Sequence, residues 1–192
     1  MNFTVPNLLS LLRMAIIPLF VIALLDGQPR RALILFLTAG VTDLLDGAIA
    51  RFFNQKSVLG TYLDPIADKL LLVTAYVMLT LPGAPGVGIP IWITVLVIAR
   101  DAIIVVMALV LHLAHGVGSF PPSWISKVNT VAQVSAVVGV LVAALVPGWE
   151  LPATVLVHVV AVLTVASGLD YIVRANRMAA RRDGAPRDSA VG

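Results

Sequence analysis

Apolar residues run along this chain in long stretches that polar clusters interrupt at regular intervals. A helix needs roughly 20 mostly apolar residues to cross a bilayer. Six stretches meet that length, at about residues 6–25, 31–53, 58–81, 89–112, 125–146 and 151–172. The breaks between them hold Gly, Pro, Asn and charged residues, which end helices. Because lipid tolerates no unpaired backbone, the pattern predicts an all-α polytopic membrane protein with six transmembrane helices.

Composition supports a membrane protein and excludes several other classes. Of the 192 residues, 59% are hydrophobic and 12% are charged, and the mean hydropathy of +1.00 is too high for an ordinary soluble domain. The 13 Lys and Arg residues are not gathered among aromatics, so nucleic acid is not an expected partner. Without cysteine, a metal site must use carboxylate, imidazole or carbonyl ligands. The first stretch contains Arg13 and Pro18 and no cleavage motif follows it, which favours a retained span.

The distribution of basic residues predicts the orientation in the membrane. With six spans, both termini lie on the same side as the connections after the second and fourth spans. That side receives most of the basic residues: Arg51, Lys56, Lys127, Arg174, Arg177, Arg181 and Arg182. The other side has Arg30 and Arg31 and little else. The positive-inside rule therefore predicts cytoplasmic N and C termini. We expect one membrane domain at residues 1–176 and a polar, flexible C-terminal tail at 177–192.

Four acidic residues lie within the second and third predicted helices. Asp43 and Asp46 are three residues apart and share one helical face, and Asp64 and Asp68 are four apart and share another. In an antiparallel hairpin about residues 54–57, Asp46 is level with Asp64 and Asp43 with Asp68, in the cytoplasmic half of the membrane. Intramembrane carboxylates are energetically costly, so each needs a partner or a function.

These acids predict a divalent-metal site. Four carboxylates so close together need cations, and Arg51 and Lys69 are too few to neutralise them. Oxygen ligands with no sulfur or imidazole nearby favour Mg²⁺ or Mn²⁺, which can also bind substrate phosphates. The small residues Gly47, Ala50 and Gly60 leave room for a ligand against the helix backbone. The alternative is a cation transporter that uses the acids as an ion pathway, and it leaves these three small residues unexplained.

The acids and small residues together form a recognisable signature. Asp43-x-x-Asp46-Gly47-x-x-Ala50-Arg51, followed by Gly60-x-x-x-Asp64-x-x-x-Asp68, resembles the signature of the CDP-alcohol phosphotransferase family at every fixed position. The resemblance covers nearly the whole chain and includes the six-span length. It implies a membrane enzyme of phospholipid biosynthesis, in which an acceptor alcohol attacks the lipid-linked phosphorus of CDP-diacylglycerol and CMP leaves.

The resemblance also implies roles for the matching residues. Asp43, Asp46 and Asp64 would be metal ligands, while Asp68 would share that site and act as general base. The CDP moiety would be seated by Asp43 and by four further residues: Gly47, Ala50, Arg51 and Gly60. The family further implies a homodimer in the cell (inner) membrane whose active site faces the cytoplasm.

The acceptor is the open question, and it depends on two polar regions at membrane depth. Arg100-Asp101 forms either a structural ion pair or part of an acceptor site. The run Ser126-Lys127-Val128-Asn129-Thr130 resembles both phosphatidylglycerophosphate synthases and CDP-alcohol-type cardiolipin synthases, and is closer to the latter. Glycerol 3-phosphate would favour several converging cations, and Asn129 removes one. Arg100, Lys127 and Asn129 are therefore candidate acceptor-binding residues, with phosphatidylglycerol slightly favoured over glycerol 3-phosphate.

Overall fold

The computed structural model describes residues 5–52, 58–115 and 124–183, with side chains described for 11–43, 66–106 and 124–174. Within these ranges the chain is all-helical, as predicted, and has no strand. Six helices follow one another: α1 (Val5–Leu25), α2 (Pro29–Phe52), α3 (Val58–Thr80), α4 (Ile91–His115), α5 (Trp124–Ala143) and α6 (Glu150–Asp183). Their bounds lie within a few residues of the predicted spans, apart from the end of α6.

Helix α6 continues past residue 172 to Asp183, and therefore includes residues 177–183 of the predicted tail. Helix α5 ends earlier than predicted, because the chain turns ahead of Pro147. The amide of Leu145 bonds the carbonyl of Val142, and Gly148 takes a positive φ of 84° that a non-glycine residue rarely adopts.

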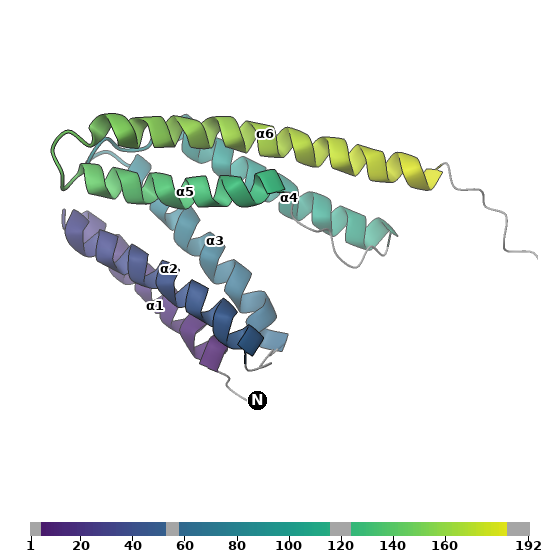
Figure 1. Ribbon diagram of the computed structural model, residues 1–192, viewed down its shortest axis with the longest axis horizontal. Helices are drawn as coiled ribbons and strands as arrows, with labels where there is room; N and C mark the ends of the chain where they lie inside the picture. Colours follow the sequence, from purple (N-terminus) through teal and green to yellow (C-terminus); the bar gives the residue numbers. More distant parts are fainter. Residues whose placement is uncertain (1–4, 53–57, 116–123, 184–192) are drawn as a thin grey trace, which may run out of the picture.

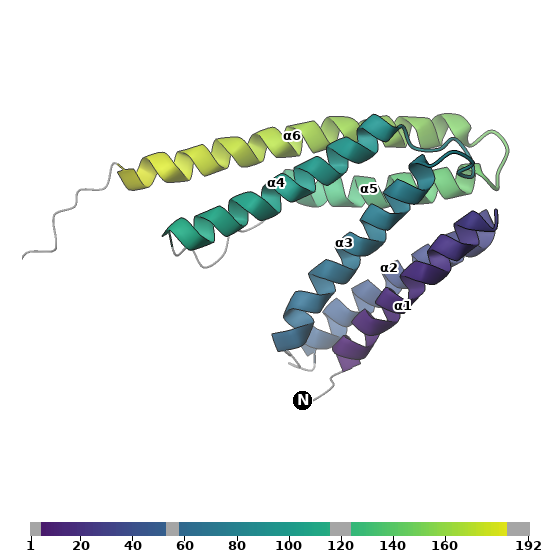
Figure 2. The same cartoon turned by 180° about the vertical axis from the view of Figure 1, so that it is seen from behind.

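The helices form two groups of three. Helix α1 packs against both α2 and α3, and α6 packs against both α4 and α5. Figures 1 and 2 show the two groups together at the end with the short connections, where α1 joins α2 and α5 joins α6, and diverging toward the opposite end. The buried core fills the region where α2 and α3 meet α5, and includes Phe20, Phe36, Tyr76, Val137 and Val140.

The outer surface of the bundle is also apolar. Leu25, Ile91, Leu151 and Val162 each expose more than two thirds of their area. Such a surface is suited to lipid rather than water. By length and composition, two helical segments among the described residues could cross a membrane, Trp124–Ala143 and Glu150–Arg174, and Leu11–Leu25 is a shorter apolar helix.

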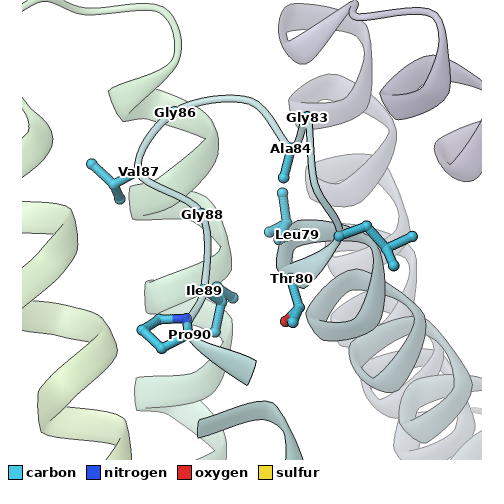
Figure 3. Close-up of a pocket in the computed structure, with 10 residues that line it drawn as sticks. Leu79, Thr80, Gly83, Ala84, Gly86, Val87, Gly88, Ile89 and Pro90 are labelled. Carbon is cyan, nitrogen blue, oxygen red and sulfur yellow. The ribbon is translucent and has the colours of Figure 1, made fainter. Parts of the chain in front are cut away.

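The connection between α3 and α4 packs closely on α5. It encloses an open hollow of about 320 Å³ lined by residues 79–81, 83–84 and 86–90 (Figure 3). The amide of Ile89 bonds the carbonyl of Leu79 at 2.8 Å, which closes the loop. This hollow begins 11 residues beyond Asp68 on α3, roughly 16 Å along the helix. It therefore lies away from the acidic residues and is part of the scaffold.

Gly86 is the residue that this packing constrains most. Its φ is +73°, and a Cβ there would lie 2.6 Å from the carbonyl oxygen of Val140 and 3.2 Å from the amide of Ala144. Gly83 in the same loop has a φ of +86° but open space around it. Both glycines are favoured by the backbone conformation, and only Gly86 is also required by contact with α5.

We therefore predict that Gly86→Ala destabilises the protein more than Gly83→Ala. Both substitutions incur the cost of a positive φ, about 1 to 2 kcal/mol. Only Gly86→Ala also pushes the loop away from the backbone of Val140 and Ala144. Thermal unfolding of the purified variants in detergent, followed by circular dichroism, measures the difference. Equal midpoints for the two variants would contradict the packing described here.

Candidate active site

A buried arginine on α1 brings together carboxylates from two other helices. Arg13 has 0% of its surface exposed. Its Nη2 lies 3.1 Å from Oδ1 of Asp43 on α2, and its Nη1 donates a hydrogen bond to Oδ1 of Asp68 on α3. A guanidinium stays charged in a protein, and a buried charge needs an ionic partner. The pairing therefore joins three helices at one point, which we call the Arg13 bridge.

The two carboxylates of the Arg13 bridge remain accessible on their other side. The side chains of Asp43 and Asp68 are 43% and 40% exposed. A carboxylate has about four lone-pair positions, so each can accept from Arg13 and still offer oxygen to a ligand. Accessible carboxylate oxygens of this kind are the ligands that a hard divalent cation binds.

The other signature residues are only partly covered by the structure. Asp46, Gly47, Ala50 and Arg51 lie within α2, and Gly60 and Asp64 lie within α3. Their side chains are outside the described part of the structure, so their roles stay predictions. Asp43 and Asp68 were expected to lie at the same height on neighbouring helices. In the structure both acids pair with Arg13 of α1, which joins them.

The donor set fits a hard divalent ion. Asp43 and Asp68 supply accessible carboxylate oxygens from two helices, and the chain has no cysteine to offer a thiolate. Among the described side chains there is no group of three or more acidic or imidazole ligands, since two of the four acids fall outside them. Oxygen donors of this kind are those that Mg²⁺ and Mn²⁺ prefer.

Lys69 does not neutralise the acids of the Arg13 bridge. Neighbouring residues on a helix project about 100° apart, so Lys69 points away from Asp68 and pairs with Asp101 on α4. Asp101 also accepts from Arg100 Nη1 at 2.8 Å. Among the described residues, the carboxylate paired with Lys69 is therefore that of Asp101. Among the described side chains, Arg13 on α1 is the cation that contacts Asp43 and Asp68.

Arg100 ties α4 to the two following helices. Its Nη2 donates to Oγ of Ser126 on α5 at 2.7 Å and to Oγ of Ser167 on α6. We call this set of contacts the Asp101 network, and its members are Lys69, Arg100, Asp101, Ser126 and Ser167. Arg100 is buried, with 6% of its surface exposed. Of the two expectations for Arg100 and Asp101, the structure therefore contains the ion pair.

The other candidate acceptor residues differ in their surroundings. Asn129 is fully buried, and its Oδ1 accepts from Thr164 on α6 at 3.1 Å. Lys127 is exposed on α5. No hydrogen bond or ion pair joins either residue to Asp43 or Asp68 among the described side chains. On α6, Asp170 pairs with Arg174 one helical turn later, at 2.9 Å.

Sequence reasoning missed Arg13, Thr164 and Ser167 as parts of these contacts. Arg13 carried a usable signal, because a charged residue within an apolar span marks a functional position by default. The two hydroxyl residues carried none, because Ser and Thr are common in membrane helices and often bond their own backbone.

Comparisons with known proteins give this geometry a context. A family model described as CDP-alcohol phosphatidyltransferase matches residues 3–169. The probable phosphatidylglycerophosphate synthase of Mycobacterium tuberculosis is 35% identical over 177 residues, 89% of this chain and 81% of that protein. The Escherichia coli CDP-diacylglycerol--glycerol-3-phosphate 3-phosphatidyltransferase is 36% identical over 179 residues, covering 90% and 94%. The human cardiolipin synthase (CMP-forming) is 35% identical over 157 residues, covering 73% and 51%.

The chain belongs to the CDP-alcohol phosphatidyltransferase family. The resemblance found in the signature is thereby confirmed, and this phosphatidyltransferase is an enzyme rather than a transporter. Asp43 and Asp68, the first and last acids of that signature, both pair with Arg13 in the described part of the structure.

The Asp101 network of this phosphatidyltransferase gives a stability prediction. Asp101→Asn leaves Arg100 buried without a carboxylate among its described contacts, so we expect a loss of about 3 kcal/mol. Asp26→Asn, in the exposed turn after α1, removes a carboxylate with no ion pair in the described structure and serves as control. Thermal unfolding in detergent should separate the two variants by several degrees. An Asp101→Asn variant as stable as the control would contradict the assigned role of the network.

Proposed function

We propose that this enzyme transfers a phosphatidyl group from CDP-diacylglycerol to a glycerol-bearing acceptor and releases CMP. Family membership supports the reaction class. One observation supports the choice of residues: Asp43 on α2 and Asp68 on α3 both pair with the buried guanidinium of Arg13. The enzyme would act as a homodimer in phospholipid biosynthesis.

The proposed roles follow the signature. Asp43, Asp46, Asp64 and Asp68 would hold Mg²⁺ or Mn²⁺. The bound metal would neutralise the diphosphate and stabilise the charge on departing CMP. Arg51 and the small residues Gly47, Ala50 and Gly60 would seat the CDP moiety with Asp43.

Asp68 is the proposed general base. Its accessible carboxylate accepts the proton of the acceptor hydroxyl as that oxygen attacks the lipid-linked phosphorus. The new phosphorus–oxygen bond forms while the bond from that phosphorus to the bridging oxygen of CMP breaks. The proton ends on Asp68, and the electron pair leaves with CMP.

We place the reaction at the cytoplasmic side of a six-span domain in the cell (inner) membrane. Six helices and the apolar outer surface of the described residues support a multi-pass arrangement. The excess of basic residues near the termini and near residues 51–56 supports the orientation. In that orientation the CDP group enters from water while the acyl chains remain in lipid.

We favour phosphatidylglycerol as the acceptor, which makes the enzyme a cardiolipin synthase. Arg100 is already paired with Asp101, and Lys69 is paired with the same carboxylate. Asn129, at a third position where a cation could lie, is neutral and buried. Of the candidate acceptor residues, Lys127 is then the cation left to bind the phosphate dianion of glycerol 3-phosphate, whereas phosphatidylglycerol presents a neutral glycerol head.

The second candidate acceptor is glycerol 3-phosphate, and chain length favours it. The relatives matched over most of their own length, 81% and 94%, are named as a probable phosphatidylglycerophosphate synthase and a glycerol-3-phosphate 3-phosphatidyltransferase. The human cardiolipin synthase is matched over only 51% of its length. The two acceptors give different lipids and are separable by one assay.

The reaction itself is tested by CMP release. Purified enzyme in mixed micelles should release CMP from CDP-diacylglycerol only when Mg²⁺ or Mn²⁺ and an acceptor are both present. Asp64→Asn should lower the rate by at least about 10³-fold, because it removes a proposed metal ligand. Asp26→Asn, with an exposed acid in the α1–α2 turn, is the matched control and should retain the wild-type rate. Undiminished release by Asp64→Asn would overturn the mechanism.

The acceptor is tested by offering phosphatidylglycerol and glycerol 3-phosphate separately and identifying the lipid product by mass spectrometry. Cardiolipin formed from phosphatidylglycerol, with no product from glycerol 3-phosphate, is the expected result. Phosphatidylglycerophosphate as the only product would establish the second candidate instead.

A further inference from the structure

Arg13 has no assigned role in the proposed reaction, although it lies at the centre of the site. It is completely buried on α1, and it contacts carboxylates of both α2 and α3. Because its guanidinium cannot lose its charge, it needs an anion in every state of the enzyme. In the ligand-free protein Asp43 and Asp68 supply that anion.

The same two carboxylates are proposed metal ligands, which creates a competition. Arg13 withdraws negative charge from the site and so lowers its attraction for a divalent cation. Conversely, when Asp43 and Asp68 bind a divalent cation, less of their charge is available to Arg13. Additional negative charge is then needed near the buried guanidinium.

The charge balance indicates which group supplies that charge. The four acids of the signature and Arg13 together carry three negative charges when the acids are ionised. Two divalent ions would leave one positive charge in excess. The diphosphate of CDP-diacylglycerol brings two negative charges, and phosphate oxygens match the planar fork of a guanidinium.

We propose that Arg13 exchanges partners during substrate binding. Without ligands it holds Asp43 and Asp68 together, and with metal bound it donates to the diphosphate of the CDP-lipid. Substrate binding thereby frees Asp68 to accept the acceptor proton. This inference rests on the proposed function and deepens it, since it names a recognition group for the diphosphate on α1.

The experiment measures two affinities in Arg13→Gln and in wild-type enzyme. Mn²⁺ binding without nucleotide is followed by electron paramagnetic resonance, and CDP-diacylglycerol binding at saturating Mn²⁺ by calorimetry in mixed micelles. Removing the competing charge should raise the Mn²⁺ affinity about threefold or more. Losing charge-assisted hydrogen bonds should lower the lipid affinity roughly tenfold or more. The two changes have opposite signs, whereas general damage to the fold lowers both affinities.

Two further variants serve as controls. Arg13→Lys keeps the charge and loses the fork, so the Mn²⁺ affinity should stay at the wild-type value while the lipid affinity falls. Arg31→Gln removes an exposed arginine in the first turn of α2 and should change neither affinity. If Arg13→Gln does not fold, Arg13→Lys carries the test by itself.

The possible failures are distinguishable. Wild-type enzyme that binds no CDP-diacylglycerol with Mn²⁺ present would overturn the proposed function itself. Wild-type binding together with unchanged lipid affinity in Arg13→Gln, or in Arg13→Lys where that variant carries the test, would overturn only the role of Arg13. A parallel fall of both affinities in a folded variant would also overturn it, because Arg13 would then be purely structural.

Discussion

The site depends on one buried positive charge in a largely apolar helix. Arg13 is fully enclosed, so it requires anionic partners, and it finds them on two different helices at Asp43 and Asp68. This requirement places α1 against both α2 and α3, with the two carboxylates turned toward a common point. Their outer oxygens stay accessible, which lets one interaction serve both the packing and the chemistry of the site.

A second group of charges continues from the first across the molecule. Lys69 follows Asp68 on α3 and reaches Asp101 on α4, and Arg100 then joins α4 to α5 and α6. Apolar packing holds the two groups of helices together where α2 and α3 meet α5. The polar contacts of Lys69 and Arg100 add links from α3 to α4 and from α4 to α5 and α6. The two buried arginines, Arg13 and Arg100, thus each have carboxylate partners, as expected when a buried charge needs an ionic partner.

The sequence allowed the helices and the family to be predicted, but not the arrangement around the acids. Hydropathy gave six segments close to the observed bounds, because lipid-facing helices need length and apolarity that are visible locally. The signature from Asp43 to Asp68 identified the chemistry, because its spacing lies within two consecutive helices. Arg13 was missed as a partner because pairing from a third helix depends on packing that sequence distance does not reveal. The early end of α5 and the extension of α6 depend on turn formation and helix continuation, which hydropathy alone does not report.

The central claim is that carboxylates from α2 and α3 form one metal site in front of Arg13. The most direct measurement is an experimental structure of the enzyme with Mn²⁺ and CDP-diacylglycerol, in which the anomalous signal locates the metal. The account predicts Mn²⁺ bound by oxygens of Asp43 and Asp68, or of their neighbouring acids Asp46 and Asp64, at roughly 2.0–2.3 Å. Mn²⁺ located elsewhere, or carboxylates of only one of the two helices at the metal, would contradict it.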